Sequence, residues 1–219
     1  MAAGAISGLY AITPDIADTT VLAEKVEAAL RGGARCVQYR NKTAPKSLKL
    51  EQARVLAALC HRHAARLIVN DGVDLAAAAG ADGVHVGRDD PSVSEARARL
   101  GSRAIVGASC YADLVRALEA EDMGVDYVAF GSFYPSGTKP EATPAPIGLL
   151  REARGVLRVP VVAIGGITVE NAASLIDAGA DALAVSGALF SAPDVTQAAR
   201  SFCALFGRGV STGRFERGS

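Results

Sequence analysis

Three polar side chains occupy every second position of the segment QYRNK at residues 38–42, namely Gln38, Arg40 and Lys42. Alternate residues of an extended chain point to the same side, so these three side chains are expected to face one ligand. An arginine can bind a phosphate group through two parallel hydrogen bonds, and a lysine adds a mobile positive charge. The segment therefore predicts a binding site for an anionic, phosphate-like group.

Two aspartates stand at the ends of later apolar runs, Asp71 in VND and Asp90 in GVHVGRDD. Carboxylates at the ends of neighbouring strands can share a hard cation, and Mg²⁺ commonly takes one or two of them together with phosphate oxygens. The competing interpretation of Asp71 is an N-cap for a helix that begins near residue 72. Taken alone, Asp71 fits the N-cap interpretation better, whereas the nearby Arg40 and Lys42 favour a metal–diphosphate site.

Glycines near the end of the chain could present backbone amides to a second phosphate. They occur as GG at residues 165–166 and as SG at residues 186–187. A glycine lets the backbone approach an oxygen without a Cβ in the way, and a helix N-terminus attracts anions. The alternative, which the two motifs alone leave open, is that these glycines only form tight turns.

The loop YPSGTKPEAT at residues 134–143 combines the hydroxyls of Ser136 and Thr138 with the cation of Lys139. Its prolines restrict the backbone at both ends of this group. We expect the loop to close on a negatively charged ligand rather than to act as a slack linker.

Short apolar runs alternate with alanine-rich helical patterns eight times along the chain. The expected strands cover residues 8–12, 34–40, 66–70, 82–86, 104–109, 126–131, 160–166 and 182–187. The expected helices cover residues 19–31, 48–63, 74–80, a segment that starts at 91–92, 112–121, 146–155, 169–179 and 193–206. Several runs are continuously apolar, which is typical of strands buried on both faces of a parallel sheet.

Eight such units predict a (β/α)8 TIM barrel, an α/β fold, as a single domain over residues 1–207. An open doubly wound sheet is the alternative, but it would leave exposed edges, and no GxGxxG motif follows the first strand. In a barrel, all the polar residues described above lie on the rim at the carboxyl ends of the strands. His85 lies within a strand and is expected to be a packed, hydrogen-bonded residue.

The composition limits the classes of partner and compartment. The 219 residues include 23 basic and 23 acidic ones, so no strong field favours nucleic acid or an anionic membrane. Four widely spaced cysteines, no apparent signal peptide and no run long enough to span a membrane favour reduced thiols in the cytoplasm. Residues 208–219 are expected to form a disordered tail, and the sequence leaves a homo-oligomer open.

The rim thus has two expected anion-binding regions, the cationic segment at residues 38–42 and the glycine turns at residues 165–166 and 186–187. They suggest two anionic small-molecule substrates, one a metal-bound diphosphate and the other a monophosphate. Diphosphate is a good leaving group once Mg²⁺ and cationic side chains neutralise its charge. No Ser–His–Asp order is visible in the sequence. A transfer reaction with release of diphosphate is therefore predicted.

Seven motifs in this order make the chain resemble the thiamine-phosphate synthase family over roughly residues 8–206. They are QYRNK, VND, GVHVGRDD, GAS, PSGTK, AIGGI and AVSGA. The resemblance implies condensation of 4-amino-2-methyl-5-hydroxymethylpyrimidine diphosphate with 4-methyl-5-(2-phosphoethyl)thiazole to give thiamine phosphate and diphosphate. It also implies a dissociative, Mg²⁺-assisted substitution in which diphosphate leaves before the thiazole nitrogen bonds.

The same resemblance implies roles for individual residues. The pyrimidine diphosphate would be held by Gln38, Tyr39, Arg40, Asn41, Lys42, Asn70, Ser109 and Lys139. The thiazole phosphate would be held by Ser136, Gly137, Thr138, Gly166, Val185 and Ser186. Asp71 and Asp90 would hold Mg²⁺, and the catalytic residues would be Arg40, Lys42, Ser109 and Lys139.

Two other functions remain as alternatives. A thiazole tautomerase-like barrel would bind the thiazole phosphate and isomerise it, and a non-catalytic sensor would bind a phosphate ligand only. Neither of these functions needs a full set of diphosphate-binding and metal-binding residues. The presence of that set in this sequence favours the synthase.

Overall fold

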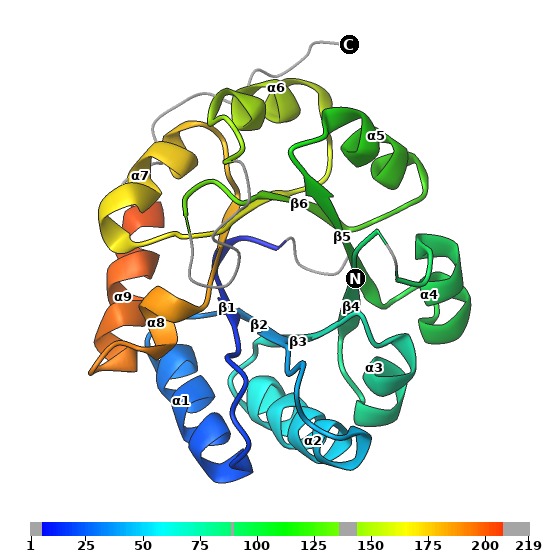
Figure 1. The fold of residues 1–219 in the computed structure, drawn as a ribbon, viewed down its shortest axis with the longest axis vertical. Helices are drawn as coiled ribbons and strands as arrows, with labels where there is room; N and C mark the ends of the chain where they lie inside the picture. The colour runs from blue at the N-terminus through cyan, green and yellow to red at the C-terminus, as the bar shows by residue number, and fades with distance from the viewer. Residues whose placement is uncertain (1–5, 89, 136–143, 208–219) are drawn as a thin grey trace.

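A computed structural model describes residues 6–88, 90–135 and 144–207 as a closed barrel of parallel strands in chain order (Figure 1). Its strands are β1 Gly8–Ile12, β2 Cys36–Tyr39, β3 Arg66–Asn70, β4 Gly83–Val86, β5 Ile105–Tyr111, β6 Tyr127–Gly131, β7 Val161–Ile164 and β8 Ala182–Val185. The pairing of β1 with β8 closes the ring. The barrel prediction is confirmed, and the doubly wound alternative is wrong.

A helix follows every strand and forms part of the outer layer (Figure 1). The helices are α1 Thr19–Arg31, α2 Lys46–Arg62, α3 Val73–Ala79, α4 Val93–Leu100, α5 Leu114–Asp122, α6 Gly148–Val156, α7 Val169–Asp177, α8 Gly187–Phe190 and α9 Val195–Phe206. Ser92 caps α4 and forms a reciprocal capping box with Glu95, as its place before the helical pattern predicts. The four-residue α8 was not expected.

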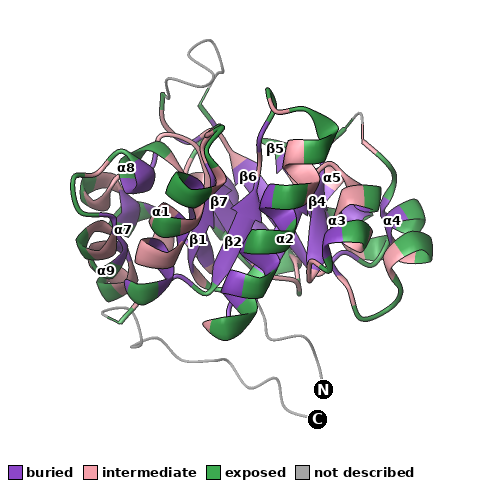
Figure 2. Ribbon diagram, turned by 90° about the horizontal axis from the view of Figure 1, so that it is seen from below, coloured by how far each residue is buried: buried purple, intermediate pink, exposed green. Residues whose placement is uncertain are grey.

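Two separate groups of apolar side chains fill the molecule, and Figure 2 shows the strands buried beneath more exposed helices. Along β1, Leu9 and Ala11 belong to the layer between sheet and helices, whereas Tyr10 and Ile12 lie in the barrel interior. Tyr127 of β6 also lies in the interior. Because strand residues alternate between these layers, every second residue of a strand can reach the rim from inside the barrel.

Aspartates tie neighbouring strands together at the end of the barrel where the strands begin. Each of three aspartates donates its backbone N–H to the backbone carbonyl of the first or second residue of the preceding strand. The carboxylate of the same aspartate accepts the backbone N–H of that strand residue. These strand-pair clamps are Asp82 with Leu67, Asp126 with Val106 and Asp181 with Val161, at N–O distances of 2.7–2.9 Å. An arginine pairs with each carboxylate: Arg66, Arg97 and Arg154, respectively. The clamps join β3 to β4, β5 to β6 and β7 to β8.

All four cysteines lie in the described residues and are free thiols, three of them buried and Cys203 half-buried. No helix within the described part of the chain combines the length and hydropathy needed to cross a membrane. The expected tail at residues 208–219 lies outside the described residues.

Candidate active site

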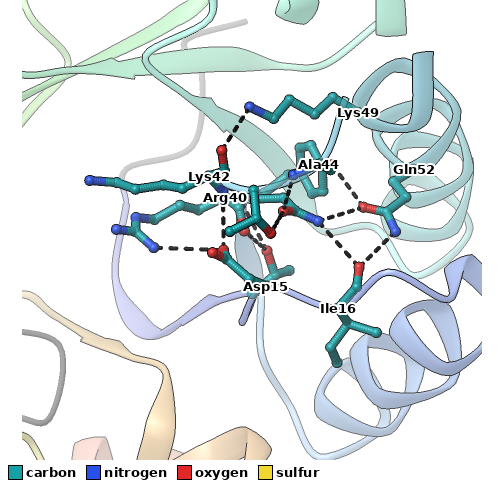
Figure 3. Close-up of polar contacts among 11 residues, drawn as sticks. Asp15, Ile16, Arg40, Lys42, Ala44, Lys49 and Gln52 are labelled. Atoms are coloured by element: carbon teal, nitrogen blue, oxygen red, sulfur yellow. Dashed lines mark hydrogen bonds and ion pairs between the residues drawn. The ribbon is translucent and has the colours of Figure 1, made fainter. Parts of the chain in front are cut away.

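The end of β2 directs two cations to one side of the rim. Figure 3 shows the side chains of Arg40 and Lys42 running in the same direction, away from Gln52. Asp15, in the loop after β1, holds this segment: its Oδ1 lies 3.8 Å from Nη1 of Arg40 and accepts the backbone N–H of Lys42 at 3.2 Å. The alternation predicted for residues 38–42 therefore continues beyond the last residue of the strand.

The residues between these cations point the other way. The hydroxyl of Tyr39 donates to Oε1 of Gln52 at 2.8 Å, and the amide of Asn41 donates to the same oxygen at 3.2 Å. Oδ1 of Asn41 also accepts the backbone N–H of Ala44 at 3.0 Å. Both side chains thus fix the loop against α2, on the side opposite Arg40. The predicted ligand contacts of Tyr39 and Asn41 stay predictions.

Asp71 directly follows β3 and has a left-handed backbone conformation, with φ 63°. Its backbone N–H donates to the carbonyl of His85 in β4 at 2.8 Å. Helix α3 has Gly72 as its N-cap and no side-chain cap hydrogen bond, so the interpretation of Asp71 as an N-cap is wrong. The carboxylate remains available to the rim.

Asp90 lies next to Asp71 and is held by the loop after β4. Its Oδ2 accepts the backbone N–H of Gly87 at 2.7 Å. Burial raises the pKa of Asp71 to about 6, the hydrogen bond and negative charge of Asp90 add to this rise, and Lys42 and Arg40 oppose it. The two predicted carboxylates and the two predicted cations therefore share one site.

This pair of carboxylates suits a hard divalent cation. Two acids held within hydrogen-bonding distance repel each other when both ionise, and a cation between them removes that repulsion. Within the described ranges, no group of three or more His, Cys, Asp or Glu residues could bind a metal. A site with two carboxylates would leave coordination positions for water and for a bound phosphate, which is the usual environment of Mg²⁺.

A hydrogen-bonded chain crosses the barrel interior beneath this rim and connects β2 to β5. Its members are Gln38, Tyr10, Tyr127, His85 and Ser109, with successive distances of 3.0, 2.8, 3.0 and 2.8 Å. We call these five residues the interior chain. Burial lowers the pKa of His85 to about 4, so the ring is neutral at pH 7. The expectation of a packed, hydrogen-bonded histidine is confirmed.

The sequence motifs assign no role to Tyr10 or Tyr127, the two tyrosines of the interior chain. The feature of the sequence that relates to Tyr127 is the glycine of the GAS motif, Gly107, because a Cβ at that position would lie 2.0 Å from the Tyr127 ring. Gly107 therefore leaves space for that ring beside β5. Asn70 is half-buried at the end of β3, two residues after the interior residue Ile68, and so lies on the interior side; its predicted contact with the pyrimidine diphosphate stays a prediction.

The turn after β7 lies against the start of the loop after β6. Gly166 has φ +62°, and a Cβ there would lie 2.4 Å from the carbonyl oxygen of Pro135. The backbone N–H of Tyr134 donates to the carbonyl of Gly165 at 3.1 Å. This glycine pair thus accommodates the adjacent loop. Ser136, Gly137, Thr138 and Lys139, which the sequence places in the site, lie outside the described residues.

The turn after β8 adjoins the same region of the rim, since β7 and β8 pair up to Ile164 and Ala184. Val185 ends β8, and Ser186 is the N-cap of α8. The carbonyl of Ser186 accepts the N–H of Phe190 at 2.9 Å. A short helix therefore begins directly after β8, as a phosphate site in such barrels often requires.

Comparison with known proteins agrees with this geometry. The family described as thiamine monophosphate synthase matches residues 9–189. A thiamine-phosphate synthase from Nitrosospira multiformis is 55% identical over 203 residues, which cover 93% of this chain and 87% of that protein. Another from Thiobacillus denitrificans is 57% identical over 199 residues, covering 91% of this chain and 94% of that protein.

A solved structure supports the same assignment. The structure of thiamine phosphate pyrophosphorylase from Pyrococcus furiosus superposes with a TM-score of 0.81 at 36% sequence identity. The match covers 92% of this chain and 96% of that one. On the family match, the relatives and the shared barrel, this chain belongs to the thiamine monophosphate synthase family.

Proposed function

We propose that this protein catalyses the thiamine-phosphate synthase reaction through the carboxylate–cation site at the ends of β2, β3 and β4. The substrates are the hydroxymethylpyrimidine diphosphate and the thiazole phosphate named above. The C–O bond to the diphosphate breaks with its electron pair on the leaving oxygen, and the thiazole nitrogen supplies the electron pair of the new C–N bond. The enzyme is thus a transferase of small molecules.

The observation that carries this proposal is the presence of Arg40 and Lys42 beside the carboxylates of Asp71 and Asp90. Two cations fixed on one side of the rim can stabilise the charge that develops on a departing diphosphate. Mg²⁺ held by Asp71 and Asp90 would neutralise part of the same charge when bound. The site offers charge stabilisation and positioning, which is what a dissociative substitution needs.

Other residues complete the two substrate sites in this proposal. Gln38, Asn70 and Ser109 face the barrel interior and would hold the pyrimidine half, with Lys139 of the loop at the diphosphate. The thiazole phosphate would meet the turns at Gly166 and at residues 185–186, together with residues 136–138. We infer a cytoplasmic location from the free thiols and the biosynthetic reaction.

The experiment is an assay of the purified protein with both precursors, with Mg²⁺ or with a chelator. Thiamine phosphate is measured by chromatography and diphosphate by a coupled assay. We expect one diphosphate per thiamine phosphate, and release only when Mg²⁺ and both substrates are present. Turnover that a chelator leaves intact would contradict the metal site, and isomerised thiazole phosphate as the only product would replace the synthase with a tautomerase.

A variant tests the cationic residue of the site. Arg40→Ala should lower kcat/KM by about 100-fold or more, because one charged donor at the leaving group is lost. Arg158→Ala is the matched control, since the Arg158 side chain is 91% exposed and lies just before β7, at the opposite end of the barrel. Equal activity of the two variants would contradict the role of Arg40.

A further inference from the structure

The interior chain contains three residues to which the proposed reaction gives no role: Tyr10, Tyr127 and His85. Tyr10 is 1% exposed and His85 6% exposed, and the ring of Tyr127 is fully buried. The two ends of the chain, Gln38 and Ser109, are the ones assigned to substrate. The chain therefore links two substrate-site residues on β2 and β5 through groups that cannot exchange partners with bulk water.

The direction of the hydrogen bonds follows from the first donor. The amide nitrogen of Gln38 donates to the hydroxyl oxygen of Tyr10 at 3.0 Å. Tyr10 then has one hydrogen to donate, and the hydroxyl oxygen of Tyr127 lies 2.8 Å away. Tyr127 in turn donates to Nδ1 of His85 at 3.0 Å. Each hydroxyl thus accepts from the residue before it and donates to the next.

The same order fixes the tautomer of His85. Both ring nitrogens bond to hydroxyl groups and neither bonds to a carboxylate, so the ring is in its neutral form, with one donor and one acceptor. Nδ1 accepts from Tyr127, so Nε2 carries the proton and donates to Oγ of Ser109 at 2.8 Å. In the opposite order the hydrogen of Tyr10 would be directed to the sulfur of Cys36, which is a weak acceptor, and the loss of a hydroxyl acceptor in a buried site is costly.

We propose that Tyr10, Tyr127 and His85 are positioning residues that make the hydroxyl of Ser109 a hydrogen-bond donor toward the bound pyrimidine diphosphate. Because Oγ of Ser109 accepts from His85, its own hydrogen is directed away from the chain and toward the half-exposed rim. The hydroxyl then meets an acceptor atom of the substrate without first having to rotate. This inference rests on the proposed assignment of Ser109 to the substrate site.

The first test is the tautomer of His85, which needs no substrate. The chain has three histidines, so ¹⁵N-histidine labelling gives a simple two-bond ¹H–¹⁵N spectrum, and His85→Gln identifies the signals of His85. We expect the Nε2–H tautomer. The Nδ1–H tautomer, which corresponds to a chain that runs from Ser109 to the carbonyl oxygen of Gln38, would overturn the proposal, as would a cationic ring at neutral pH.

The second test breaks the chain far from Ser109. Tyr10→Phe removes the hydroxyl that orients Tyr127, so we expect mixed tautomers of His85 and a five- to tenfold rise in KM for the pyrimidine diphosphate. The KM for the thiazole phosphate should not change. Tyr127→Phe is the second variant, in case Tyr10→Phe fails to fold. Ile68→Val is the control, since it loses one methyl group in the same interior cluster without touching a hydroxyl.

The outcomes separate this inference from the proposed function. A folded Tyr10→Phe variant with the tautomer and the KM of the wild type would overturn the positioning role. If Ser109→Ala kept full activity, the assignment of Ser109 to substrate would be wrong, whatever the tautomer. An impaired Ser109→Ala variant together with the Nδ1–H tautomer would overturn the positioning role proposed for Tyr10, Tyr127 and His85 and leave the assignment of Ser109 to substrate intact.

Discussion

Asp71 is the residue at which backbone strain, burial and like charge meet. A positive φ is uncommon for residues other than glycine and is frequently retained at functional sites. Its pKa, raised to about 6, means that the folded protein holds the ionised carboxylate at a cost when no cation is present. The protonated carboxyl group of Asp71 stabilises the folded protein at low pH, and this stabilisation is lost as the pH rises through about 6. At pH 8, the metal-free site is therefore destabilising.

We predict that Asp71→Asn raises the melting temperature of the metal-free protein at pH 8 by about 2–4 °C. After allowance for solvent screening at a half-exposed group, the relieved repulsion is worth about 1 kcal/mol. Asparagine also tolerates a positive φ, so the backbone is not strained further. Mg²⁺ should stabilise the wild type and leave the variant unchanged in thermal unfolding.

Asp74→Asn provides the comparison for this experiment, because the Asp74 side chain is 88% exposed and pairs with Arg99 on the surface. It should behave like the wild type with and without Mg²⁺. A variant at Asp71 that Mg²⁺ still stabilised as strongly as the wild type would argue against these carboxylates as the metal site.

The chemical types in the site could be predicted from sequence more readily than the directions of individual side chains. Arg40, Lys42, Asp71 and Asp90 share one site because strand ends in a parallel barrel meet at one rim. From sequence, Asp71 as a metal ligand could not be distinguished from Asp71 as a helix N-cap, since both interpretations place a carboxylate just before a helix. The interior chain depends on which tyrosines face inward across the barrel, which local pattern does not specify.

At the scale of elements, the loops after β6 and β7 fit against each other. The backbone N–H of Phe133 donates to the carbonyl of Ile164 at 3.1 Å, and the turn at Gly166 packs under Tyr134 and Pro135. A side chain at residue 166 would therefore move the loop that begins after β6. The contact with residues 134–135 thus explains sterically why residue 166 is a glycine, independently of any bound phosphate.

We predict that Gly166→Ala lowers kcat/KM at least tenfold, because the new Cβ displaces residues 134–135. Gly80→Ala is a matched control: Gly80 has φ +68°, close to the +62° of Gly166, but a Cβ there meets no atom within 4 Å. Both variants should lose about 1–2 kcal/mol of stability in urea unfolding from the positive φ. Only Gly166→Ala should lose activity, and equal kinetics would contradict this account.

The order and type of the elements were predictable from the sequence, whereas some ends were not. The apolar runs at residues 67–69 and 127–131 identify buried strands, and the capping box at Ser92 fixes the start of α4. Helix α8 was missed because four residues do not complete enough turns to show a helical period. The expected strand at 160–166 includes a glycine turn that begins after Ile164.

At the scale of the whole molecule, two buried groups give opposite pH dependences over one range. The unfolded chain binds a proton at His85 near pH 6.5, whereas the folded protein binds it only near pH 4. Stability therefore falls as the pH drops from 6.5 toward 4. Asp71 acts in the opposite direction as its carboxylate is protonated. His85 should dominate because it lies in the closed interior, while Asp71 lies at the rim.

We predict that the wild type loses stability on acidification from pH 6.5 to pH 4.5, by roughly 1 kcal/mol per pH unit. His85→Gln should be less stable at pH 7, because it breaks the interior chain, but its stability should depend less on pH. His63→Gln, at the end of α2, should keep the wild-type dependence. Urea unfolding at a series of pH values measures all three, and an unchanged slope in His85→Gln would contradict the role of His85.

The strand-pair clamps have a consequence for where the chain can be cut and rejoined. New termini in the segment between α2 and β3, at residues 63–65, would leave all three clamps intact. New termini between α3 and β4 would put Asp82 at a chain end and release its hold on β3. The barrel is thus a succession of two-strand modules, and circular permutants that respect the module boundaries are the ones expected to fold.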